Sequence, residues 1–434
     1  MAFWPHNVHK SEGIPKQLNL FTLPPVQSAV EKSYFVDCRP VSQISDGSPI
    51  EFNIANQGSD YIDLQRSRLY IKGKIVAGDG TTIDAAKEVG PINFLHQTLF
   101  DQIDVRYNGK LITSSDGNFG YKAYLQTLLN SSTEKIKSFQ QMGLFYEETN
   151  VFDTDPVGGS NPGMSARFAV TKGSKVFEMT GPILQDCFQA DRYLINNVDI
   201  SVKLYRNRPI FYLKSTEAKP DFKFEILDIY FRVCKISLNP AVFIAQEKEI
   251  ENIPALYPYR RTECRVANVN TGQTSFHWDA IFQNHLPLKV AIAFVNSSGY
   301  TGDWIKNPFR FEAAGVGEIA LLVDGVSIPM APMKLAYDSK QYVQAYANLF
   351  DGSGKWTDNS GLYITKEKFT DGHAIYLFTL ETPFDEDSLS LMKNGNLRLE
   401  VNFSSALTTN YTCIAYAEFQ QIIQIDKSRT ITLN

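Results

Sequence analysis

Several features that would place this chain of 434 residues in a membrane or a secretory pathway are missing from it. Its apolar runs are short, such as Ala241–Ala245 and Ile319–Val323, whereas a membrane-spanning helix needs about 18 or more apolar residues in a row. The first residues, MAFWPHNVHKSEGIPK, contain neither an apolar stretch nor a cleavage-site pattern. We therefore expect no transmembrane segment, no secretory signal and a protein that is made inside a cell.

Cysteine and clustered positive charge are also scarce. The five cysteines are odd in number and far apart, with no CxxC, which disfavours both a disulfide framework and a zinc cluster. The 42 basic residues are outnumbered by 47 acidic ones, and residues 1–32 carry only three lysines against two glutamates. Because proteins that bind nucleic acid need clustered Lys and Arg to neutralise phosphates, we expect no sequence-specific nucleic-acid binding.

Patterns typical of catalytic sites are absent or incomplete. Gly315–Ala320 has the spacing of a dinucleotide-binding motif, but a β-like run follows it where that motif needs a helix. His277, Asp279 and His285 come nearest to a metal site, yet a predicted turn separates His285 from the other two. No GxSxG elbow and no matched pair of catalytic carboxylates is found. We predict no catalytic residues, no cofactor, no metal ion and no enzyme activity.

What the sequence does contain is aromatic residues in short alternating runs. It has 29 Phe, 21 Tyr and 4 Trp, and aromatic side chains favour strands. Arg68–Val76, Val198–Leu204 and Leu397–Phe403 alternate apolar with polar residues, as strands with one buried face do. Asn108-Gly109 and Asp324-Gly325 are signals for tight hairpins. Because convincing amphipathic helices are few, we predict an all-β protein.

The order of these patterns repeats once along the chain. The repeated elements are a hairpin, a short helix and a long closing strand pair: Ile103–Ile112, Tyr121–Leu129 and Phe222–Ile236 in the first half, and Ile319–Ile328, Tyr342–Phe350 and Tyr411–Ile425 in the second. A repeat spacing of roughly 200 residues is too long for a solenoid. It indicates two copies of one β domain in tandem.

Each copy has room for about eight strands, and antiparallel strands in that number commonly form a two-sheet sandwich with jelly-roll wiring. We therefore predict two tandem eight-stranded jelly rolls with short inserted helices and an extended N-terminal arm. The predicted boundaries are 1–47 for the arm, 48–240 for the first jelly roll, 241–259 for the linker and 260–434 for the second jelly roll. The arm has five prolines and little alternation, so we expect it to need a partner surface.

Two groups of residues are predicted to contact another subunit. The arm carries large apolar side chains on a segment too short for its own core, and the run after the linker combines tyrosine with arginine, which are enriched at protein interfaces. Contacts within the chain are the alternative for both groups. The candidate residues are Phe3, Trp4, Phe21, Leu23, Tyr257, Tyr259, Arg260 and Arg261.

Over nearly its whole length the sequence resembles the double jelly-roll major capsid proteins of Polinton/Maverick-type elements and the related adintoviruses. The stretches that carry the resemblance are Leu23–Lys32 (LPPVQSAVEK), Ser48–Phe52 with Asp60–Ile71 (DYIDLQRSRLYI), Ile229–Ile236 (IYFRVCKI), Tyr257–Thr262 (YPYRRT), and Asn307–Phe311 with Val323–Pro329 (VDGVSIP). No single stretch is a strong motif; their order on a duplicated β frame is what makes them specific.

The resemblance implies a virion protein that is synthesised and assembled inside a host cell. It would form homotrimers with a pseudo-hexameric outline, which tile an icosahedral shell around double-stranded DNA together with penton and minor or cement proteins. A domesticated host copy is a further possibility. Two alternatives belong to other classes: a tandem β-sandwich that binds carbohydrate, as lectins do, and an enzyme of the cupin or glycosidase type, for which the required residues are not found.

Overall fold

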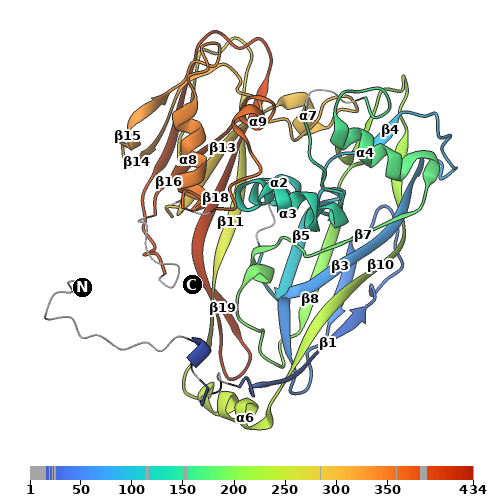
Figure 1. The fold of residues 1–434 in the computed structure, drawn as a ribbon, viewed down its shortest axis with the longest axis vertical. Coiled ribbons are helices and arrows are strands. Elements are labelled where there is room, and N and C mark those ends of the chain that lie inside the picture. The colour runs from blue at the N-terminus through green and yellow to red at the C-terminus, as the bar shows by residue number, and fades with distance from the viewer. Residues whose placement is uncertain are drawn as a thin grey trace, which may run out of the picture.

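The fold was analysed in a computed structural model, which describes residues 16–18, 20–21, 23, 26–113, 117–149, 155–283, 285–357, 359–381 and 389–433. Two β-sandwiches lie side by side, with α2 between them and α6 at one end of the molecule (Figure 1). We call them the first and the second roll.

The first roll contains two four-stranded antiparallel sheets, ordered β1-β10-β3-β7 and β2-β8-β5-β6. Their strands are β1 (Val30–Cys38), β2 (Ile50–Ile54), β3 (Tyr61–Ala77), β5 (Phe100–Tyr107), β6 (Lys110–Leu111), β7 (Phe177–Gly181), β8 (Ile200–Arg206) and β10 (Phe222–Leu238). β4 (Val89–Pro91) and β9 (Leu213–Ser215) form a separate ribbon. Counted along the chain, the eight strands are ordered 1-8-3-6 and 2-7-4-5, which is jelly-roll wiring.

The second roll repeats this wiring, with sheets ordered β11-β18-β13-β16 and β12-β17-β14-β15. Its strands are β11 (Ala255–Val269), β12 (Ser275–Trp278), β13 (Lys289–Asn296), β14 (Val316–Val323), β15 (Val326–Lys334), β16 (Ile375–Thr379), β17 (Leu397–Phe403) and β18 (Tyr411–Ile425), to which β19 (Ile431–Leu433) is added. The predicted pair of tandem eight-stranded jelly rolls is therefore confirmed.

The repeated sequence patterns occupy equivalent places in the two rolls. Asn108-Gly109 turns β5 into β6 and Asp324-Gly325 turns β14 into β15; all four residues have positive φ, as a tight hairpin turn of this type requires. Phe222–Ile236 and Tyr411–Ile425, predicted as strand pairs, are instead single long strands, β10 and β18. Each crosses a sheet next to the first strand of its roll.

Short helices connect the strands. They are α1 (Leu95–Thr98), α2 (Phe119–Asn130), α3 (Thr133–Lys137), α4 (Pro162–Thr171), α5 (Pro209–Tyr212), α6 (Pro240–Glu249), α7 (Ser297–Thr301), α8 (Val343–Ser353) and α9 (Lys366–Thr370), with 3₁₀ turns η1 (Lys16–Leu18), η2 (Phe139–Gly143), η3 (Lys172–Ser174) and η4 (Asp186–Gln189). α2 and α8 are the two predicted helices that follow the hairpins.

The structure departs from two of the predicted boundaries. β1 lies within residues 1–47, predicted as an arm, and pairs with β10, so the first roll begins at Val30. Most of α6 and the start of β11 lie within residues 241–259, predicted as a linker. Alternation in β1 is weak because its side chains are half-buried or exposed and none is fully buried.

Candidate assembly interface

No group of three or more His, Cys, Asp and Glu residues is placed to hold a metal ion in the described part of the chain. His277 is exposed, and the carboxylate of Asp279 pairs with Arg398 at 3.2 Å. None of the described helices has the length and apolar character that a membrane crossing requires.

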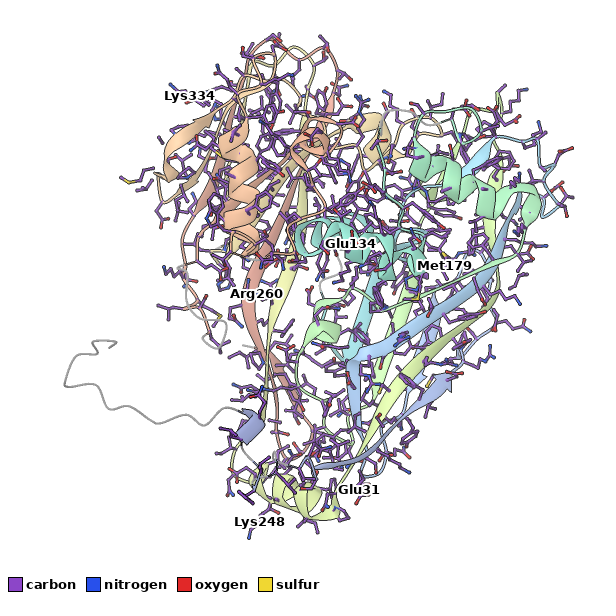
Figure 2. All side chains as sticks on the ribbon, in the orientation of Figure 1. Glu31, Glu134, Met179, Lys248, Arg260 and Lys334 are labelled. Carbon is purple, nitrogen blue, oxygen red and sulfur yellow. The ribbon has the colours of Figure 1, made fainter. Side chains whose placement is uncertain are left out.

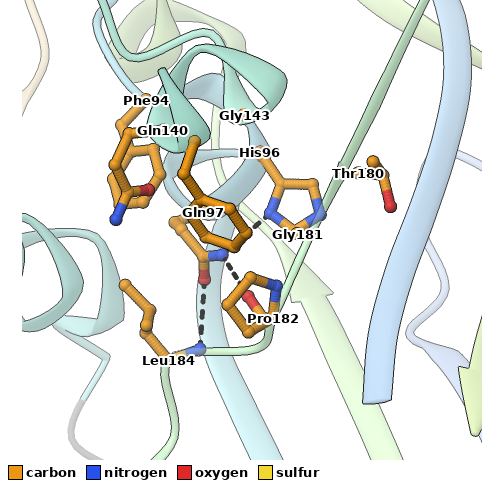
Figure 3. Close-up of a pocket in the computed structure, with 10 residues that line it drawn as sticks. Phe94, His96, Gln97, Gln140, Gly143, Thr180, Gly181, Pro182 and Leu184 are labelled. Atoms are coloured by element: carbon orange, nitrogen blue, oxygen red, sulfur yellow. Dashed lines mark hydrogen bonds between the residues drawn. The ribbon is translucent and has the colours of Figure 1, made fainter. Parts of the chain in front are cut away.

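A small cavity beside α1 is a structural site (Figure 3). Its volume of ≈ 10 Å³ has room for about one water molecule. His96 on its wall has one ring nitrogen 2.9 Å from the Leu69 carbonyl and the other 2.8 Å from the Gln97 amide. Burial lowers the pKa of His96 to about 4, so this imidazole is neutral at pH 7 and ties α1 to β3.

A buried charge cluster joins the first roll to the second. The carboxylate of Asp186 in η4 accepts hydrogen bonds from Lys122 Nζ of α2 at 3.0 Å and from the Thr262 amide and hydroxyl, both at 2.8 Å. Thr262 belongs to β11, and the Lys122 and Asp186 side chains are almost wholly buried. Lys122 and Asp186 both belong to the first roll, so the two hydrogen bonds from Thr262 are what cross to the second roll. Separating the rolls here would remove both of these donors from a buried carboxylate.

Aromatic rings of α2 extend the same contact. Tyr124 stacks on Phe309 of the second roll with ring centroids 4.1 Å apart, and Tyr121 stacks on Tyr300 at 5.6 Å. The Tyr300 hydroxyl donates to the Asn118 side chain at 3.0 Å. Stacked aromatic pairs of this kind stabilise an interface by about 0.5–1.5 kcal/mol each beyond the area that they bury. The two rolls are therefore held as one body.

Two predicted inter-subunit residues, Tyr257 and Tyr259, are turned towards their own chain. The Tyr257 hydroxyl accepts from the Ile195 amide at 3.0 Å and donates to the Tyr193 carbonyl at 3.2 Å. The Tyr259 hydroxyl donates to Gln421 at 2.7 Å, and both residues are buried. The tyrosines thus serve contacts within the chain, which is the alternative that the sequence left open.

The arginines of the same run lie differently. Arg260, which is labelled in Figure 2, is half-exposed. It pairs with Glu381 and Glu418 at 3.5 and 3.3 Å. Arg261 lies over the Phe419 ring, 4.8 Å from its centroid. Arg260 is therefore the most exposed of the four residues, Arg261 is partly exposed, and the two tyrosines are buried.

The segment before β1 exposes large apolar side chains. Phe3 and Trp4 lie outside the described residues. Phe21 and Leu23 are 96% and 89% exposed, and Leu18, Leu20 and Val26 are exposed as well. The segment joins the body where the Ala29 carbonyl accepts a hydrogen bond from the Asn239 amide, at the start of α6.

Beside α6 lies a groove of ≈ 550 Å³ that sequence reasoning missed. Its lining includes Tyr193, Leu238, Ile250, Ile253 and Leu256. Of these, Tyr193, Ile253 and Leu256 are exposed large apolar residues. Ile253 in the Pro-rich linker was the signal for it, but the other wall comes from a connection some sixty residues earlier in the chain.

Equivalent sheets of the two rolls differ in what covers them. In the second roll, nine consecutive residues of β18, Tyr411–Phe419, are buried on both sheet faces. In the first roll, β10 alternates and β3 exposes Arg68 and Lys72. Tyr70 and Tyr230 stack on this outer face at 4.5 Å. The first roll therefore presents an uncovered sheet face rich in arginine, lysine and tyrosine.

Comparison with known proteins identifies the architecture. No protein-family model matches the sequence. A Caenorhabditis elegans protein described only as uncharacterized is 23% identical over 426 residues, covering 94% of this chain and 98% of that protein. The Sputnik virophage structure contains a chain with a TM-score of 0.61 at 11% identity, over 98% of this chain and 93% of that one. The mavirus major capsid protein gives 0.54 at 13% identity, over 100% and 97%. The chain has the fold of viral double jelly-roll major capsid proteins.

Proposed function

We propose that this chain is a structural major capsid protein that forms homotrimers with a pseudo-hexameric outline. The observation that carries the proposal is the pair of identically wired rolls, locked side by side by the Asp186 cluster and the α2 rings. Three copies of such a body supply six similar rolls for one ring. The likeness to the Sputnik and mavirus chains over nearly the whole length supports the same role.

In this proposal the trimers tile an icosahedral shell around double-stranded DNA, with penton and minor or cement proteins as further partners, and the protein is located in the virion after assembly in a host cell. Acidic residues outnumber basic ones, so genome packing relies on other components rather than on phosphate contacts. We propose further that the chain belongs with Polinton/Maverick-type elements or adintovirus-like viruses, and its likeness to the mavirus major capsid protein supports this.

The segment before β1 is the proposed tie between capsomers. Its exposed Phe21 and Leu23 would dock on a neighbouring copy, since apolar groups of this size gain about 1.5–3 kcal/mol each when fully buried. Deleting residues 1–25 is expected to leave trimers intact and to weaken closed shells. Shells of full stability from the deleted chain would contradict this role.

The first test is the solution mass of the purified chain by light scattering, with negative-stain images of the same fraction. We expect a species close to three times 48.9 kDa, with hexagonal outlines or closed shells. A monomer that persists across salt and pH would overturn the proposal. A glycan array on that monomer would then test the carbohydrate-binding alternative.

A further inference from the structure

The connection between the sixth and seventh strands of the first roll holds the first strand of the second roll. This first-roll connection, residues 182–199, joins β7 to β8. Asp186 bonds Thr262, the backbone of Tyr193 and Ile195 bonds the Tyr257 hydroxyl, and Arg192 donates to the Leu256 carbonyl at 2.6 Å. All three contacts are on β11. The first roll thus contacts the second roll through this connection.

The equivalent connection of the second roll carries exposed apolar side chains in its described part. This second-roll connection, residues 380–396, joins β16 to β17. Leu389, Leu391 and Met392 within it are 56%, 78% and 58% exposed. Three large apolar side chains in four residues are thus accessible in the connection that is equivalent to the one by which the first roll contacts β11. Burying them elsewhere would be favourable, at about 25 cal/mol per Å² of apolar surface.

The strand equivalent to β11 in the first roll is equally open. Phe35 of β1 pairs with Cys234, the thirteenth residue of β10, and Tyr257 of β11 pairs with Ile423, the thirteenth residue of β18. Phe35 and Tyr257 therefore occupy matching positions. Tyr257 is 7% exposed, whereas Phe35 is 43% exposed. β1 is also the edge strand of its sheet.

We infer that residues 389–392 of one copy pack against β1 of a second copy next to Phe35. Within one chain, the first-roll connection packs against β11 next to Tyr257 in the equivalent way. The described residues that lead into β17 and the strand β1 lie on opposite flanks of the molecule (Figure 1), so one copy cannot make both halves of the contact. A head-to-tail contact of this kind closes into a ring when the rotation allows it. The inference rests on the proposed trimer and assigns its contact residues.

Cross-linking tests the contact directly. In full-length chain with Cys38→Ser, the other native cysteines are buried, and Phe35→Cys with Leu391→Cys adds two accessible thiols. A short bis-maleimide is expected to give covalent dimers and trimers in denaturing gels. The single variants, and Phe35→Cys paired with Ile305→Cys, should stay at the monomer band, because Ile305 is comparably exposed outside the connection.

A charge substitution tests the energetics. Leu389→Glu and Leu391→Glu would bury a carboxylate in the contact, so we expect each to raise the protein concentration for half-assembly at least about tenfold. Ile305→Glu is the matched control, since Ile305 is 58% exposed and Leu389 is 56%. Circular dichroism of each variant verifies folding.

The outcomes separate the two proposals. Cross-linked trimers together with weakened assembly of Leu389→Glu and Leu391→Glu would support the contact. If the wild-type chain forms trimers but the Phe35→Cys, Leu391→Cys variant does not cross-link, and Leu389→Glu and Leu391→Glu assemble as well as Ile305→Glu, this contact is overturned and the capsid proposal stands. A wild-type chain that stays monomeric would overturn both.

Discussion

Between Tyr411 and Phe419, β18 of the second roll has no exposed residue, whereas β10, its counterpart in the first roll, alternates between buried and solvent-facing side chains. The strand order around both is the same. The difference arises because the first roll lies against the β11 and β18 side of the second, while none of the described residues covers the exposed side chains on the outer face of β1 and β10. Identical wiring thus leaves one of two equivalent faces free.

The largest effect is expected at the Asp186 cluster, where the first roll contacts the covered sheet of the second. Asp186→Ala would leave Lys122 buried without its counter-charge and the Thr262 amide without its acceptor. Breaking a buried pair from one side costs about 3–5 kcal/mol. We expect chemical denaturation to show that loss, with the rolls unfolding in separate transitions. A single transition at wild-type denaturant concentration would mean that the cluster does not couple the rolls.

Acid is expected to lower the stability of the fold through a buried imidazole in each roll. The pKa of His96 is lowered by burial from 6.5 to about 4, and burial also lowers the pKa of His373 in the second roll. Between these two values the unfolded chain binds a proton at His96 that the folded chain does not. The free energy of unfolding therefore falls as pH drops from about 6.5 to about 4, by up to about 3 kcal/mol for His96.

The measurement for this prediction is the free energy of unfolding against pH for His96→Gln and for His277→Gln, which alters an exposed imidazole of the second roll. His96→Gln should flatten the acid slope, and His277→Gln should not. Equal slopes in wild type and His96→Gln would contradict the assignment.

The two equivalent helices should respond in opposite directions to the same change. A Cβ on Gly352 of α8 would lie 2.5 Å from Leu377 of β16, whereas one on Gly120 of α2 would lie 3.5 Å from Phe211. Gly352→Ala should therefore destabilise by about 1–3 kcal/mol through overpacking. Gly120→Ala should be neutral or stabilising by up to about 1 kcal/mol through helix propensity. Thermal unfolding of both variants tests this contrast. If both substitutions destabilise the protein, the prediction is contradicted.

The smallest effect is expected on the open face. Asp37 and Arg232 form a bidentate pair there with both side chains about half exposed, and exposed pairs contribute about 0–1 kcal/mol. Asp37→Ala should therefore change the free energy of unfolding of the monomer by no more than about 1 kcal/mol. If Asp37→Ala nevertheless impairs assembly, the open face contributes to contacts between copies.

Sequence patterns predict the wiring of each roll better than they predict what the rolls present to each other. Asn108-Gly109 and Asp324-Gly325 mark hairpins locally, because the turn itself requires positive φ. The burial of Tyr257 depends instead on Tyr193 and Ile195, on a different roll, and no local pattern reports such a partner. The exposed apolar residues Leu389, Leu391 and Met392 did leave a signal in the sequence, because they stand together in a polar stretch. A search for alternating strand patterns does not detect such a signal.

The pairing of β1 with β10 also has a consequence for how the protein is made. Val30 and Leu238 meet at the two extremes of the first roll, so its sheet cannot close until nearly all of that roll has left the ribosome, and contacts of such long sequence separation form slowly. Once β10 is out, the roll is complete while the second is still unsynthesised, and domains tend to fold in that order. The finished first roll then offers α2 and η4 as a template against which β11, the next strand to emerge, can settle.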